Sequence, residues 1–357
     1  MPTKHFGILL LAILLVTALI ALPPFIITIT SQTASANPTQ ENFTIVALPD
    51  TQYYSKTYAW IFENQTNWIV QNENEKNIVF VAHMGDIVNE YFEDYEWQFA
   101  DNAMGILDNK VPYGILPGNH DIASGGETPK YENHFPASRY EGYGYWGGSY
   151  DSYSVISSSP NMNNYQLFSA GGMNFIALNL QYNPPADVIS WAGNVLNKYK
   201  NRRAIISTHA YLDLDGTKLF EGRHIWDNLV VPHNNVFLVL CGHMYADSEP
   251  GEAQKIDNLG NRTVYQLLAD YQGLPSGGDG WLRIMKFVPS ENTIQVKTYS
   301  PYLDNYRTNS DSQFELYYPM NETVAPTGGI SLWIYVGVVI VIVVIITVII
   351  TTSPPKQ

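Results

Sequence analysis

The sequence of 357 residues predicts an α/β fold in which two β-sheets face each other and helices cover their outer faces, an αββα sandwich. Segments of strand length alternate with segments of helical periodicity through the first half of the chain. Several of the strands are continuous apolar runs, as expected for sheets covered on both faces. The second half adds pairs of strands that read as hairpins.

The first half of the predicted domain repeats strand and helix. Residues 43–48 alternate in polarity and are rich in β-formers, and residues 56–77 carry aromatic and aliphatic side chains at helical spacing. The apolar run 78–82 follows as a buried strand. A helix over residues 93–110 then leads to a third strand over residues 112–116. Each of these strands ends at a polar loop.

Regular patterning is lost between residues 122 and 159, which are rich in Gly, Tyr and Ser. A loop of this length inside a domain is usually a lid, a binding loop or a disordered segment, and we expect a lid over the site. Beyond it the sequence predicts a hairpin of residues 165–169 and 173–180, a helix over 186–200, strands over 203–208 and 236–241, hairpin-like strands over 255–269, and a strand pair over 281–288 and 293–299.

Apolar runs flank this domain on both sides. Residues 1–36 have the layout of a secretory signal peptide, or of a signal anchor if it is not cleaved. Residues 330–350 carry no charge and as a helix would span about 31 Å, which matches a bilayer core. We therefore expect a domain over residues 37–328 on the outer face of the cell membrane, held by a single transmembrane helix, with residues 351–357 as a short cytoplasmic tail.

The charge balance excludes one class of function. The chain has 19 Lys+Arg and 33 Asp+Glu, a net charge of −14. Such a surface repels phosphate backbones, so we do not expect a nucleic-acid scaffold protein, whereas metal cations are compatible partners. The sequence contains one cysteine, Cys241, so the fold depends on core burial rather than on disulfides within the chain.

Polar side chains follow five of the predicted strands. They are two carboxylates, an amide and two imidazoles: Asp50, Asp86, Asn119, His209 and His243. In α/β sheets this edge is where ligands bind, and carboxylate with imidazole is the donor mixture that suits Zn, Mn or Fe. One such residue alone is commonly structural. Five of them in one chain indicate a metal site.

These residues lie in five short blocks of sequence, in a fixed order. The blocks are Asp50-Thr51-Gln52, Gly85-Asp86, Gly118-Asn119-His120-Asp121, His209 and Gly242-His243-Met244-Tyr245. The chain thereby resembles the calcineurin-like metallophosphoesterases, whose blocks are Asp-x-His, Gly-Asp, Gly-Asn-His-Asp/Glu, a lone His and Gly-His-x-His. The third block is the most specific. The family fold, a two-sheet αββα sandwich, agrees with the pattern of elements.

The resemblance implies two divalent metal ions, with Mn, Zn or Fe expected. Asp86 would bridge them, and Asn119, His209 and His243 would hold the second ion.

The first metal ion is where this sequence departs from the family. Asp50 is present, but the two histidines of the family pattern are replaced by Gln52 and Tyr245. Oxygen donors in place of imidazoles shift the metal preference of the first site from Zn toward Mn, Mg or Ca, or toward Fe(III) if Tyr245 ionises. We take Gln52 as a ligand through its amide oxygen. Tyr245 is either a ligand or part of the pocket wall.

The activity implied is hydrolysis of a small phosphoester, either a monoester or a diester. Two cations about 3.5–4 Å apart lower the pKa of a bridging water, which supplies hydroxide for in-line attack. His120, positioned by Asp121, would stabilise the transition state or protonate the leaving oxygen. The alternatives are a non-catalytic cell-surface binding protein with a degraded first metal site, and a hydrolase that uses one metal ion. Substrate identity and oligomeric state are left open.

Overall fold

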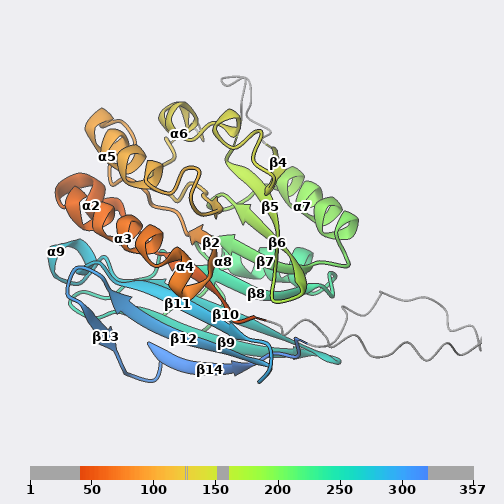
Figure 1. Cartoon of the computed structure of the whole chain (residues 1–357). Coiled ribbons are helices and arrows are strands. Elements are labelled where there is room, and N and C mark those ends of the chain that lie inside the picture. Colours follow the sequence, from red (N-terminus) through yellow and green to blue (C-terminus); the bar gives the residue numbers. More distant parts are fainter. Residues whose placement is uncertain (1–40, 125, 127, 151–160, 321–357) are drawn as a thin grey trace, which may run out of the picture. The chain divides into compact units, whose positions relative to one another are not determined.

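The computed structural model describes residues 41–124, 126, 128–150 and 161–320, and the structural statements below concern these residues (Figure 1). The predicted signal segment and the apolar run 330–350 lie outside them, so both stay predictions. Within the described residues, no helix is both long and apolar enough to cross a membrane.

The first sheet has parallel strands on one side and antiparallel strands on the other. Its strands are β1 (Phe43–Leu48), β2 (Ile78–His83), β3 (Tyr113–Gly114), β11 (Leu282–Val288), β12 (Thr293–Ser300), β13 (Asn305–Arg307) and β14 (Gln313–Tyr317). Strands β1, β2 and β3 pair in parallel, and β11 pairs antiparallel with β1 and β12. The order is β13-β12-β11-β1-β2-β3, and β14 pairs with β12.

The second sheet has the order β4-β5-β6-β7-β8-β10-β9. Its strands are β4 (Trp146–Tyr150), β5 (Asn163–Ala170), β6 (Met173–Leu180), β7 (Arg203–Thr208), β8 (Val236–Cys241), β9 (Gly251–Leu259) and β10 (Arg262–Asp270). Strands β6, β7, β8 and β10 are parallel neighbours. Their carboxyl ends therefore meet at one edge of the sheet, where ligands bind in α/β folds.

Helices lie between the strands along the chain. They are α2 (Gln52–Thr57), α3 (Ala59–Gln71), α4 (Glu73–Lys76), α5 (Asp94–Gly105), α6 (Pro129–His134), α7 (Ala186–Lys198), α8 (Phe220–Ile225) and α9 (Pro275–Gly278), with a 3-10 turn η1 (Ala137–Arg139) and a π-helical turn η2 (Trp226–Val230). Figure 1 shows α2, α3 and α5 grouped together and apart from α7.

Alternate residues of β1 show how both faces of the first sheet are covered. Phe43 and Ile45 belong to an apolar cluster that also contains Phe175 of the second sheet, so this cluster lies between the sheets. Val46 and Leu48 point the other way, into a cluster with side chains of α3 and α5. A third cluster joins α7 and α8 to the second sheet. The predicted two-sheet α/β fold is confirmed.

The segment between residues 122 and 159 differs from the expectation. Its described part contains α6, η1 and β4 rather than a structureless lid. Tyr131, Phe135 and Tyr140 are buried in the same apolar cluster as Trp97 of α5. Aromatic burial orders this stretch, although its Gly- and Tyr-rich sequence shows no helical or strand period. Residues 151–160 lie outside the described part.

A buried ion pair joins the two sheets. Glu252 of β9 and Arg283 of β11 lie 2.8 Å apart, from Oε1 to Nη2, and both side chains are almost fully buried. The carboxylate also accepts hydrogen bonds from Tyr271, Thr298 and Ser312. Burial alone raises the pKa of Glu252, but the Arg283 charge and these hydroxyl groups hold that pKa below its usual value.

Replacement of Glu252 is expected to destabilise the fold. Glu252→Gln leaves the buried guanidinium of Arg283 without a countercharge, which costs about 3 kcal/mol of the free energy of unfolding. Urea denaturation followed by circular dichroism measures this change. The control is Glu315→Gln on β14, an exposed side chain whose loss should change stability by about 0.5 kcal/mol or less. Equal stability of the two variants would contradict a structural role for the pair.

Candidate metal centre

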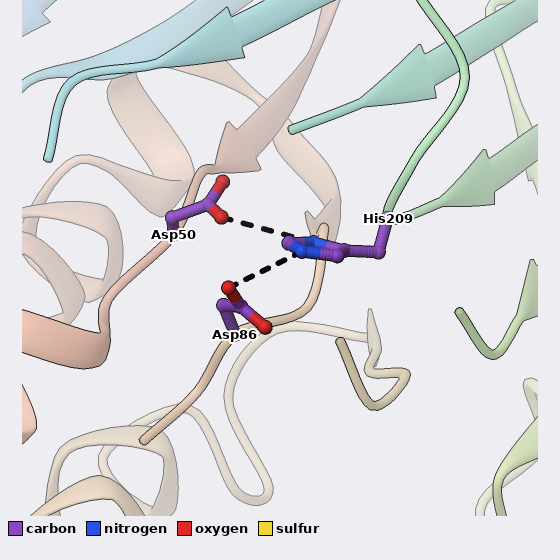
Figure 2. Close-up of side chains that lie close together, drawn as sticks. All are labelled: Asp50, Asp86 and His209. Carbon is purple, nitrogen blue, oxygen red and sulfur yellow. Dashed lines mark ion pairs between the residues drawn. The ribbon is translucent and has the colours of Figure 1, made fainter. Parts of the chain in front are cut away.

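Two carboxylates and one imidazole converge at the carboxyl ends of three strands. Asp50 follows β1, Asp86 follows β2 and His209 follows β7, and Figure 2 shows both carboxylates pointing at the imidazole. His209 Nδ1 lies 3.7 Å from Asp50 Oδ1, and His209 Nε2 lies 3.2 Å from Asp86 Oδ2. All three side chains are buried, and their potential ligand atoms lie within 4.8 Å of one another.

The glycines of the sequence blocks make room for these carboxylates. A Cβ on Gly118 would lie 2.1 Å from Asp86 Oδ1, and a Cβ on Gly242 would lie 2.1 Å from Asp50 Oδ2. Asp86 and His243 have φ values of 48° and 77°. Residues other than glycine adopt this left-handed region at a cost of about 1–3 kcal/mol. Strain of this kind at several positions of one site is typical of a binding centre.

Four donor atoms gather around one position. The ring atom His209 Nε2 lies 2.9 Å from Asn119 Oδ1, 3.2 Å from His243 Nδ1 and 3.2 Å from Asp86 Oδ2. This is the set of residues that the sequence predicts for the second metal ion, and the fold brings all four together. Tyr182, after β6, covers this group with its ring 5.7 Å from that of His243.

The surroundings of His209 favour its protonated form. Nδ1 donates to the Met84 carbonyl at 3.0 Å, and Nε2 faces two oxygen acceptors. Although burial alone lowers the pKa of His209, the charges of Asp86 and then Asp50 raise it to about 10. Burial and the nearby positive charge of His209 lower the pKa of His243 to about 4. His243 therefore presents a neutral nitrogen to the same position.

His120 and Asp121 are placed differently from the expectation. The ring nitrogen Nδ1 of His120 donates to the Asn89 carbonyl at 2.7 Å, so Asn89, not Asp121, orients this imidazole. The Asp121 carboxylate instead accepts from the backbone N–H groups of Ile87, Val88 and Gly118. Asp121 thus joins the loops that carry Asp86 and Asn119, because each loop donates to the same buried carboxylate.

Gln52 and Tyr245, the two departures from the family pattern, lie in unlike surroundings. Gln52 is 2% exposed, its Nε2 donates to Gln272 Oε1, and its Oε1 is buried without a hydrogen-bond partner among the described residues. Tyr245 is 38% exposed and interacts with Tyr53. Of the two roles left open for Tyr245, this position favours the pocket wall.

The sequence predicts at most that Asp270 and Gln272, at the end of β10, border the substrate, and it does not predict them as metal ligands. Both are buried, and burial raises the pKa of Asp270 to about 7. Burial and then the charge of Asp270 hold the pKa of Asp50 well above its usual range. The signal that could have identified these residues is the repeat of the Asp-x-Gln pattern of residues 50–52 directly after another strand.

The donor set fits metal ions. Asp50 and Asp86 lie against one cationic imidazole, and the buried Asp270 carboxylate interacts electrostatically with the same ring, so a metal ion would compensate the negative charge of these groups. The unpaired Gln52 Oε1 is a buried acceptor that a cation would satisfy. Imidazole, carboxylate and amide oxygen are together suited to divalent ions such as Mn²⁺ or Zn²⁺.

The chain belongs to the calcineurin-like phosphoesterase family, because the family model matches residues 43–247. The Bacillus subtilis (strain 168) protein YvnB is 36% identical over 270 residues, which are 74% of this chain and 20% of YvnB. The chain thus spans about a fifth of the length of that relative.

One solved structure agrees at the level of the fold, and a second is reported beside it. The yellow lupin (Lupinus luteus) purple acid phosphatase PPD1 has a TM-score of 0.50 at 13% identity, covering 82% of this chain and 57% of that one. Plasmodium GAP50, described as the anchor in the inner membrane complex, has a TM-score of 0.45 at 11% identity. The match covers 81% of this chain and 98% of GAP50.

Metal binding at this centre is expected to release a proton. The folded pKa of His209 lies above the ordinary value of about 6.5, so at pH 7 Nε2 carries a proton that a bound cation must replace. Calorimetric titration with Mn²⁺ in two buffers of different ionisation enthalpy measures the release. Affinity should rise with pH from about pH 6 to pH 8, a range that lies below the folded pKa, because a lower proton concentration makes the competing proton easier to displace. Binding without proton release and without pH dependence would contradict this assignment.

Proposed function

We propose that this protein hydrolyses small phosphoesters with the help of two divalent metal ions. The observation that carries the proposal is the convergence of Asp86, Asn119 and His243 on the Nε2 atom of His209. Family membership supports the same reaction class. Ions held at this centre would activate a water molecule and neutralise charge on the phosphoryl oxygens.

The protein's own groups fix the geometry of the reaction. The Met84 carbonyl accepts from His209 Nδ1, which leaves Nε2 for the ion and sets the plane of the ring. Asp86 Oδ1 accepts the backbone N–H of His120 at 2.9 Å, so its Oδ2 remains directed at His209. These contacts hold the donors before substrate arrives, which is the condition for electrostatic stabilisation of a transition state.

His120 is the proton donor of the proposed reaction. Its Nδ1–H is engaged with the Asn89 carbonyl, so the ring is held in one orientation and Nε2 is available to the substrate. In the imidazolium form, Nε2–H can protonate the leaving oxygen. Asp121 supports this indirectly, because it ties the backbone around Asp86 to the loop of Gly118.

Hydrolysis should depend on added metal. The full-length chain, stripped with a chelator, is expected to hydrolyse p-nitrophenyl phosphate or bis-(p-nitrophenyl) phosphate only after Mn²⁺, Zn²⁺ or Fe²⁺ is restored. Elemental analysis should then give two ions per chain. One ion per chain with full turnover would replace the two-metal proposal by the one-metal alternative. No bound ion and no turnover with any metal would overturn the enzyme proposal in favour of a binding protein.

Loss of the His120 imidazole is expected to separate turnover from metal binding. His120→Ala should lower kcat about 100-fold or more, as for the removal of a general acid, while metal content stays unchanged. The matched control is His224→Ala on α8, where the histidine interacts with Asn228 within its own helical segment. If His120→Ala and the control hydrolyse substrate equally fast, the role given to His120 is wrong.

A further inference from the structure

The chain contains two Asp-x-Gln segments, and the fold brings them together. Asp50 to Gln52 follow β1 of the first sheet, and Asp270 to Gln272 follow β10 of the second sheet. Strand β10 pairs in parallel with β8, with Leu268 opposite Cys241. Asp270 and His243 therefore each lie two residues beyond a paired position, at the same edge of the sheet.

A chain of hydrogen bonds connects the two segments through their amides. Gln52 Nε2 donates to Gln272 Oε1, and Gln272 Nε2 donates to Asp270 Oδ2 at 3.1 Å. The backbone N–H of Gln272 also donates to Asp270 Oδ1 at 2.9 Å. Gln272 thus fixes the rotation of the Gln52 amide and the position of the Asp270 carboxylate at the same time.

One atom of this network has no hydrogen-bond partner in the part of the chain that the structure describes. Gln52 Oε1 is buried and makes no hydrogen bond to any described residue, although the nitrogen of the same amide is paired. A buried acceptor without a partner is costly and uncommon in proteins. Asp50, two residues earlier, is also buried, and it interacts electrostatically with the carboxylate of Asp270. An ion at this place would satisfy the free oxygen and compensate the carboxylates.

The segment that carries Asp270 is rigidly held. Tyr271, between Asp270 and Gln272, donates its hydroxyl to Glu252 Oε1 at 2.8 Å and lies 3.3 Å from Arg283 Nη2. The ion pair that joins the two sheets therefore fixes the backbone on which the Asp270 and Gln272 side chains stand. Fixed donors of this kind are what a specific metal site requires.

We propose that Asp270 is a ligand of the first metal ion and that Gln272 positions the Gln52 amide so that Oε1 faces the same ion. With Asp50 and Asp86, this ion is held by oxygen atoms alone, in place of the two imidazoles of the family pattern. Oxygen-only sites favour Mn²⁺ or Mg²⁺ over Zn²⁺. The inference rests on the proposed two-metal function, and it assigns Tyr245 to the rim of the site.

Metal binding by variants of the full-length chain tests this assignment without reference to turnover. The wild-type chain should bind two Mn²⁺ ions, as measured by calorimetry and by elemental analysis. Asp270→Asn should keep one ion and weaken the other about 100-fold, and Gln272→Leu should weaken the same ion about 10- to 100-fold. The control is Asp247→Asn, which removes an exposed carboxylate near the centre and should bind both ions as the wild type does.

A variant with a changed metal preference shows that weaker binding in the other variants is not caused by misfolding. Asp270→His returns an imidazole to the first site and should shift its preference from Mn²⁺ toward Zn²⁺ in a competition titration. If Asp270→Asn and Gln272→Leu bind both Mn²⁺ ions as tightly as the wild type, the inference is overturned. If the wild-type chain binds no divalent ion, the proposed function itself fails, and that result is distinct from the first.

Discussion

The burial of His209 among carboxylates is the constraint on which the rest of the centre depends. Its imidazole is fully buried, with Asp50 on one nitrogen and Asp86 on the other. Like charges in a low-dielectric interior repel strongly, which contributes to the raised pKa values of Asp50 and Asp270, and a bound cation would favour the charged form of both carboxylates. The protonated ring supplies one positive charge, and divalent ions would supply more. The first requirement on this site is therefore that its buried negative and positive charges compensate each other.

The backbone conformation holds the charged side chains of the centre in place. The left-handed conformations of Asp86 and His243 aim their side chains inward, and glycines at 118 and 242 leave room for the carboxylates opposite them. The Asp121 carboxyl group accepts three backbone N–H groups and does not contact His120, although the two residues are adjacent in the sequence. His83 acts similarly, since its ring contacts Thr51 and accepts the N–H of Gly85. Polar residues in and beside the sequence blocks thus also hold the loops of the centre in place through hydrogen bonds.

The sequence predicted what depends on local pattern and missed what depends on pairing between distant strands. Strands such as β1 and β8 are buried on both faces, so their apolar runs are visible, and the residues after them mark one edge of the sheets. Asp270 was not identified as a donor because nothing local tells that β10 runs parallel to β8. It also lies beyond residue 247, where the family match ends. The ordered aromatic stretch around Tyr131 was missed for the same reason, because its partners lie on α5.

The contact between Gln52 and Gln272 joins residues that are 220 positions apart in the chain. A growing polypeptide therefore carries Asp50 and Asp86 long before the ribosome has added β10 and the residues after it. Until then, the N-terminal carboxylates have neither the second sheet to bury them nor the donors that complete their surroundings. The order of synthesis thus makes the centre one of the last features of the domain to form, and an unfinished chain holds its acidic residues open to water.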